Sequence, residues 1–199
     1  MDFHTVTASR VFGVEPDAVT SAERAKIKAM NYGLAYGLSA FGLSQQLNID
    51  TSEAKALMEE YFERFGGVRD YLRSLVADAR KTEYTETILG RRRYLPDLMS
   101  DNRQRREMAE RMALNAPIQG SAADIIKVAM LDVERALADA GMASRMLLQV
   151  HDELVFEVGP GERAAIEQLV RDKMGQAVEM TVPLDVSVGV GRSWHEAAH

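Results

Sequence analysis

The chain has 199 residues, of which 46% are hydrophobic and 27% are charged, and it contains no cysteine. This composition is typical of a soluble chain of one or two domains, and the lack of cysteine excludes disulfides, a thiolate nucleophile and any zinc site with sulfur ligands. The four histidines are too scattered to form a metal cluster, and the formal net charge of −6 excludes a chain that is basic throughout.

The charge is unevenly distributed. Residues 91–111 hold seven arginines and four acidic residues, a local charge of +3. A phosphate responds to charges within about a Debye length of ~10 Å, so this segment is compatible with a DNA partner, although a solvated charged face is the alternative. The N-terminus lacks a signal-peptide pattern and no apolar run reaches the ~18 residues of a membrane span, so we expect a cytoplasmic protein without a membrane partner.

The first half of the chain is predicted to be helical. A helix over residues 22–38 follows a cap at Thr20 or Ser21, and Asp50 with Glu53 resembles a capping box for a helix that runs to residue 65. Two glycines interrupt the pattern before a further helix to about residue 81. Residues 84–96 alternate around a glycine, which predicts a short hairpin.

The second half has a different pattern. A helix over residues 103–115 is expected to break at Pro117 and Gly120. The next helix, ended by Gly141, has one apolar face made of Ala122, Ile126, Ala129, Met130, Val133 and Leu137.

Strands are predicted only toward the C-terminus and in the short hairpin. Two apolar runs within residues 146–158 predict a second hairpin, a helix is expected over residues 162–178, and strict alternation over residues 182–190 predicts a further strand. We therefore expect an α+β fold: a helical part, residues 1–102, followed by residues 103–199 with an antiparallel sheet backed by helices.

Four residues spaced four apart lie on one face of the first predicted helix: Arg24, Lys28, Tyr32 and Tyr36. They span about 18 Å at 1.5 Å per residue. Two cations followed by two aromatic rings match a triphosphate, a sugar and a base. A helix with a basic exposed end and a buried aromatic end is the structural alternative.

Two further groups carry candidate chemistry. His151, Asp152 and Glu153 lie at the tip of the second hairpin, where carboxylates can converge to bind Mg²⁺, although a plain polar turn is the alternative. Arg111 and Asn115 share a helical face and can donate hydrogen bonds to nucleic-acid bases. Gln119 has similar chemistry beyond Pro117, and a polar helix edge followed by a loop is the alternative here.

Together these segments resemble the family A DNA polymerases of bacteria. RAKIKAMNYGLAYG (residues 24–37) resembles the fingers-helix motif of that family, RMALNAPIQGSAADIIK (residues 111–127) its palm segment, and LLQVHDELVFEV (residues 147–158) its catalytic hairpin. GRSWHEAAH at the end resembles the family's C-terminus. The motifs stand in the family's order over essentially the whole chain.

The resemblance implies a role for each candidate residue. Residues 1–102 would be the fingers and residues 103–199 part of the palm. The incoming deoxynucleoside triphosphate would be held by His4, Arg24, Lys28, Tyr32 and Tyr36, with Lys28 also the proton donor to the leaving pyrophosphate. Asp152 and Glu153 would bind Mg²⁺ and act in catalysis, and the primer-template DNA would be contacted by Arg111, Asn115, Gln119 and His151.

One family motif is missing. Family A polymerases carry a second catalytic aspartate upstream of the fingers, and nothing here resembles it, so a two-metal site would be only partly supplied by this chain. We therefore expect a fragment that lacks the thumb and the remaining palm, with an unpaired strand edge that favours self-association.

Three functions remain open from the sequence. The leading one is template-directed DNA synthesis, in replication and repair, by a nucleoid-associated enzyme. The second is a non-catalytic module that binds nucleotide or DNA, which the missing aspartate favours for the isolated chain. The third is an unrelated helical interaction domain.

Overall fold

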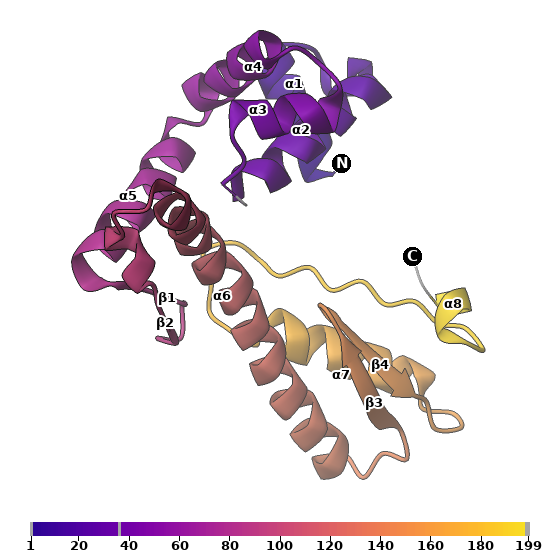
Figure 1. The fold of residues 1–199 in the computed structure, drawn as a ribbon. Helices are drawn as coiled ribbons and strands as arrows, with labels where there is room; N and C mark the ends of the chain where they lie inside the picture. Colours follow the sequence, from indigo (N-terminus) through magenta and orange to yellow (C-terminus); the bar gives the residue numbers. More distant parts are fainter. Residues whose placement is uncertain (1, 36, 198–199) are drawn as a thin grey trace. The chain divides into compact units, whose positions relative to one another are not determined.

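The chain divides into two compact units, Met1–Gly120 and Ser121–His199. The computed structural model describes residues 2–35 and 37–197. Within them the structure is mainly helical with two small antiparallel sheets, which confirms the α+β class (Figure 1). The assignment of residues 1–102 and 103–199 to fingers and palm stays a prediction.

Four helices of the first unit pack around one apolar core (Figure 1). They are α1 (Phe3–Phe12), α2 (Ser21–Ala35), α3 (Ala40–Leu47) and α4 (Thr51–Arg64), with a short 3-10 helix η1 (Pro16–Ala18) after α1. Ile27 and Met30 of α2 are fully buried against Ala8 of α1, so the face of α2 opposite to them is left for solvent and ligands. Neither α1 nor α3 was predicted from the sequence.

The capping box lies at the beginning of α2, not of α4. Glu23 accepts hydrogen bonds from the backbone N–H (2.8 Å) and hydroxyl of Thr20, and the Thr20 hydroxyl accepts one from the N–H of Glu23 at 3.2 Å. These contacts lower the pKa of Glu23, the Thr20 N–H contributing most. Asp50 precedes α4 without a side-chain capping bond, and Glu53 instead pairs with Lys26, so the predicted box at Asp50 was wrong.

A second small core is formed by α5 (Gly66–Thr82), the residues that follow the predicted first hairpin and the first part of α6 (Arg103–Asp139). Strands β1 (Tyr84–Glu86) and β2 (Arg92–Tyr94) pair antiparallel, which confirms the hairpin, and the 3-10 helix η2 (Pro96–Met99) follows. The buried residues of this core are Ala79, Leu95, Leu98, Ala109 and Ala113.

Helix α6 (Arg103–Asp139) runs without interruption through Pro117, so the predicted break at Pro117 and Gly120 was wrong. Proline removes one backbone hydrogen bond and costs about 3 kcal/mol inside a helix. Packing outweighs that cost, because Ala113 and Pro117 are both buried. Gly120 has a steric role, since a Cβ at this position would lie 2.6 Å from Cγ2 of Thr87 in the hairpin loop.

The second unit builds its core from the end of α6, the hairpin and α7. Strands β3 (Arg145–Val150) and β4 (Glu153–Glu157) pair antiparallel, and α7 (Arg163–Gly175) and the short α8 (Trp194–Ala197) follow. The buried core residues are Val133, Leu137, Ile166 and Val170. Of the six residues predicted on the apolar face of α6, Ile126, Ala129, Val133 and Leu137 are buried, whereas Ala122 is exposed and Met130 is partly buried.

Helix α6 ends at a glycine, as the sequence predicts. Gly141 has a φ of 61°, its N–H donates to the carbonyl of Ala138, and the N–H of Met142 donates to the carbonyl of Leu137. These two bonds form a Schellman motif, which needs a left-handed residue and therefore favours glycine. The prediction that α6 ends at Gly141 is confirmed.

Residues 182–190 do not form a strand, so this prediction was wrong. The segment alternates as a half-buried strand does, but it pairs with no strand among residues 2–35 and 37–197. It is held instead by side chains, because Val186 packs against the core of the second unit and its carbonyl accepts a hydrogen bond from Arg171. Alternating apolar and polar residues indicate which side of a segment is buried. A strand also needs the hydrogen-bonding edge of a second strand to pair with.

Replacing Gly120 by alanine is expected to destabilise the first unit. Alanine is normally favoured over glycine in a helix by about 1 kcal/mol, but the overlap with the Thr87 methyl group should reverse the sign, with a net loss of about 1–3 kcal/mol. Thermal unfolding of the variant shows whether the free energy of unfolding falls or rises. The double variant Gly120→Ala/Thr87→Ser, which removes the obstructing methyl group, should regain at least wild-type stability; a double variant as unstable as Gly120→Ala would contradict this account.

Candidate functional site

Asp2 joins the beginnings of α1 and α2. Its carboxylate caps α1 by accepting hydrogen bonds from the N–H groups of His4 (3.0 Å) and Thr5 (3.4 Å) and from the Thr5 hydroxyl (2.7 Å). Arg24 donates to both oxygens of the same carboxylate, from Nε and Nη2, at 3.2 Å each. The Thr5 hydroxyl first, and Arg24 second, hold the pKa of Asp2 well below its usual range.

Four of the predicted site residues line one pocket of the first unit. The pocket has a volume of about 380 Å³, within the range of small-molecule sites. Helix α1 contributes Phe3 and His4, α2 contributes Asn31 and Tyr32, and α6 contributes Asn115, Ile118 and Gln119. The structure therefore brings together His4, Tyr32, Asn115 and Gln119, which lie up to 115 positions apart in the sequence.

The continuity of α6 explains how Asn115 and Gln119 reach this pocket together. They are four residues apart in an uninterrupted helix, so they lie on the same face, with Arg111 one turn earlier. The side chain of Arg111 is exposed and lies outside the pocket lining, with Nη2 near Sδ of Met108 at 3.9 Å. The sequence left the face of Gln119 open, and the unbroken helix determines it.

The pocket has an aromatic wall around His4. The imidazole lies between the rings of Phe3 and Tyr32, each with its centroid 5.7 Å away. Tyr32 is 50% exposed, so its ring is available to a ligand. The predicted alternative, a buried aromatic end of the helix, is wrong for Tyr32, whereas Tyr36 lies outside the described residues.

Two acceptors in the pocket residues lack hydrogen-bond partners. The side-chain Oδ1 atoms of Asn31 and Asn115 are both buried without a donor. Buried polar atoms nearly always have a hydrogen-bond partner in the protein or in water. Two such oxygens without a partner in one pocket therefore indicate a ligand or ordered water. Asn31 was missed by the sequence analysis, although it follows Lys28 by three residues and so lies beside it on α2.

The two predicted phosphate-binding cations lie on the same helix but outside the pocket lining. Lys28 is exposed, and Arg24 is held by Asp2. Arg24, Lys28 and Tyr32 follow one another at intervals of about one helical turn, so Arg24 and Tyr32 are about 12 Å apart along α2. Asp2 is a second residue that the sequence analysis missed; its place two residues before His4, at a helix beginning, is the signal that could have identified it.

The other predicted residues lie at the tip of the β3–β4 hairpin in the second unit. Val150 pairs with Glu153, so His151 and Asp152 form a two-residue turn, and His151 has a φ of 54°. The side chain of Gln149 donates a hydrogen bond to the carbonyl of His151, which holds the turn. Glu153 is the first residue of β4, and its Oε2 accepts a hydrogen bond from Nε1 of Trp194 at 3.2 Å.

The residues at this tip do not form a metal site by themselves in the part of the chain that the structure describes. His151, Asp152 and Glu153 are all exposed. Among residues 2–35 and 37–197, no group of three or more histidine and acidic side chains is placed to hold a metal ion. Asp152 and Glu153 supply two carboxylates, which is the number that protein sites commonly offer to Mg²⁺ when substrate phosphates complete its coordination.

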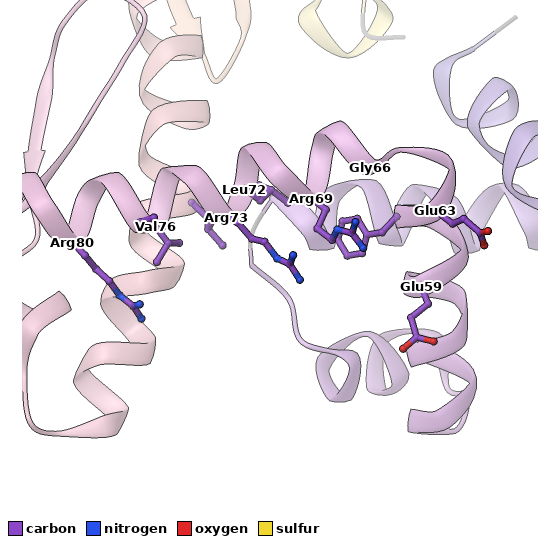
Figure 2. A pocket seen from close by; sticks show the side chains of 11 residues that line it. Glu59, Glu63, Gly66, Arg69, Leu72, Arg73, Val76 and Arg80 are labelled. Carbon is purple, nitrogen blue, oxygen red and sulfur yellow. The ribbon is translucent and has the colours of Figure 1, made fainter.

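A larger groove, of about 940 Å³, contains none of the predicted residues (Figure 2). Arg69, Arg73 and Arg80 extend from α5, and Glu59 and Glu63 from α4 (Figure 2). Arg80 is paired with Glu110. Because acidic and basic groups line this groove together, its charge does not favour a polyanion.

The chain belongs to DNA polymerase family A, whose family model matches residues 1–196. It is 68% identical over its whole length to DNA polymerase I of Mycobacterium tuberculosis and 49% identical over 98% of its length to DNA polymerase I of Streptococcus pneumoniae. In each case it covers 22% of the relative, so the chain spans about a fifth of the length of these relatives.

A solved structure shows the same fold. The polymerase domain of Pol1 from M. smegmatis, in complex with DNA primer-template and dNTP, matches with a TM-score of 0.96 and 67% identity. The match covers 100% of this chain and 35% of that one. In the part of the chain that the structure describes, no helix has both the length and the apolar character needed to cross a membrane.

Acid is expected to weaken the contribution of Asp2 to stability. The pKa of Asp2 is lowered in the folded protein, so its ionised form stabilises the fold above the unfolded pKa of about 3.9, and this stabilisation is lost as the pH falls below that value. The measurement is the melting temperature of wild type and Asp2→Asn between pH 2 and pH 7. Wild type should melt higher at pH 6, and the gap should narrow steadily below about pH 4. A gap that is independent of pH would refute this assignment.

Proposed function

We propose that this chain supplies the nucleotide-binding site and part of the primer-template site of a template-directed DNA polymerase. The observation that carries the proposal is the pocket that gathers His4, Tyr32, Asn115 and Gln119 around two unpaired buried amide oxygens. The M. smegmatis structure supports it, because that protein is bound to DNA primer-template and dNTP.

The reaction joins a deoxynucleoside triphosphate to a primer. The primer 3′ hydroxyl releases its proton to water as its oxygen attacks the α-phosphorus. The bond between that phosphorus and the oxygen bridging to the β-phosphate breaks, and pyrophosphate leaves. Arg24 and Lys28 bind the triphosphate from one face of α2, with His4 beside them on α1. Lys28 donates a proton to the leaving pyrophosphate, a contribution typical of general acids.

The remaining pocket residues recognise the sugar, the base and the DNA. Tyr32 presents a half-exposed ring to the sugar and base. Tyr36, four residues later in the sequence, acts at the nascent pair. Asn115 and Gln119, with Arg111 on the same face of α6 and His151 in the second unit, contact primer-template DNA near the growing end.

Asp152 and Glu153 are the carboxylates proposed to hold Mg²⁺. When bound, the ion would stabilise the charge of the transferring phosphoryl group. The indole N–H of Trp194 fixes Glu153 in the second unit by occupying one of its oxygens. In this proposal residues 1–102 act as fingers and residues 103–199 as part of the palm, in replication and repair at the bacterial nucleoid.

The proposal is tested by comparing two lysines of α2 in primer extension. Lys28→Ala, in the protein at its natural full length, should lower kcat/KM by about 100-fold or more, since it removes both a phosphate contact and a general acid. Lys26→Ala is the matched control, because Lys26 pairs with Glu53 at the surface and such pairs contribute ~1 kcal/mol or less. Equal effects of the two changes would remove the basis for a nucleotide site on this face.

A second comparison separates synthesis from binding alone. Asp152→Asn should abolish extension, a loss of at least about 1,000-fold, while the protein still retains primer-template DNA in a filter-binding measurement, because only the metal-binding charge is removed. Asp185→Asn, an exposed acid of the same unit, should leave extension within about twofold of wild type. Full extension by Asp152→Asn would show instead that this hairpin carboxylate takes no part in catalysis, and would contradict its proposed role in holding the metal ion.

A further inference from the structure

Asn31 is the pocket residue that contacts a ring nitrogen of His4. Its Nδ2 lies 3.1 Å from Nδ1 of His4, in a partly buried position, and both residues line the pocket. An amide nitrogen only donates, so Nδ1 of His4 accepts in this arrangement. The ring proton of a neutral His4 is therefore on Nε2.

The same contact suits the charged form of His4. If the imidazole is protonated on both nitrogens, Nδ1 becomes a donor, and the Asn31 amide can turn by 180° so that Oδ1 accepts. In the present arrangement Oδ1 is buried without a partner, so turning breaks no hydrogen bond of that oxygen. In both protonation states the nitrogen left for a ligand is Nε2, and it carries a proton.

The rest of the surroundings limits the movement of the His4 ring. The backbone N–H of His4 is bound by Asp2, and the ring lies between Phe3 and Tyr32. None of these contacts distinguishes the two ring nitrogens, because the aromatic rings have no hydrogen-bonding group directed at either in the described structure. Among the contacts that the structure describes, Asn31 alone selects between Nδ1 and Nε2.

We propose that Asn31 is a positioning residue that holds His4 through Nδ1 and so presents Nε2–H as a hydrogen-bond donor to the triphosphate of the incoming nucleotide. The proposal rests on the proposed function. Asn31 does not itself contact the phosphates; it acts through His4. A donor of fixed tautomer matches an anionic ligand, whereas a ring free to exchange tautomers would present a lone pair for part of the time, which repels phosphate.

The test is a double-mutant cycle in the protein at its natural full length. Single-turnover extension gives the apparent Kd for the nucleotide and the maximal rate for wild type, Asn31→Leu, His4→Ala and the double variant. Asn31→Leu should raise the apparent Kd about five- to tenfold and change the maximal rate by less than about twofold. In the His4→Ala background the same change should alter the Kd by less than about twofold.

Controls separate this role from a structural one. Gln46→Leu replaces an exposed amide on α3 and should leave both constants within about twofold of wild type. Asn31→Ser, which is too short to reach Nδ1, repeats the test if Asn31→Leu melts well below wild type. Equal effects of the Asn31 change with and without His4 would overturn the proposal, because Asn31 would then act independently of the ring. Failure of wild type itself to bind nucleotide would instead count against the proposed function.

Discussion

The carboxylate of Asp2 organises the end of the molecule on which the pocket depends. It caps α1, accepts a hydrogen bond from the backbone N–H of His4, and accepts hydrogen bonds from Nε and Nη2 of Arg24 on α2. Without this contact the two helices would still share the apolar core around Ala8 and Ile27. The core, however, sets only how deeply the helices pack, whereas directional hydrogen bonds determine which polar groups face one another.

Helix α6 is the second element that shapes the pocket. A proline inside a helix is costly, yet continuity through Pro117 keeps Asn115 and Gln119 in register on one face. Gly120 follows immediately and lets the hairpin loop approach at Thr87. Sequence rules associate proline and glycine with the end of a helix, yet Pro117 and Gly120 both lie inside a continuous helix here.

Features that depend on residues close together in the sequence were mostly predicted correctly. The wrong predictions concern features that depend on contacts between distant residues. The cap at Thr20, the helix stop at Gly141 and both hairpins depend on neighbouring residues, so the sequence could indicate them. The strand over residues 182–190 failed because pairing depends on a distant edge. The candidate site was only partly predictable. Spacing placed Lys28 and Tyr32 on one face of α2, although only Tyr32 lines the pocket. No spacing rule brings His4 of α1 to Asn31 of α2 or to Asn115 of α6.

The backbone of His151 restricts which residues the hairpin tip can accept. A left-handed conformation costs a non-glycine residue about 1–2 kcal/mol, and histidine is among the few side chains found there more often than average. Glycine would relax the backbone but remove the imidazole, and a β-branched residue would add to the strain. The tip therefore carries some backbone strain in order to present a side chain, and only a narrow set of residue types suits this conformation.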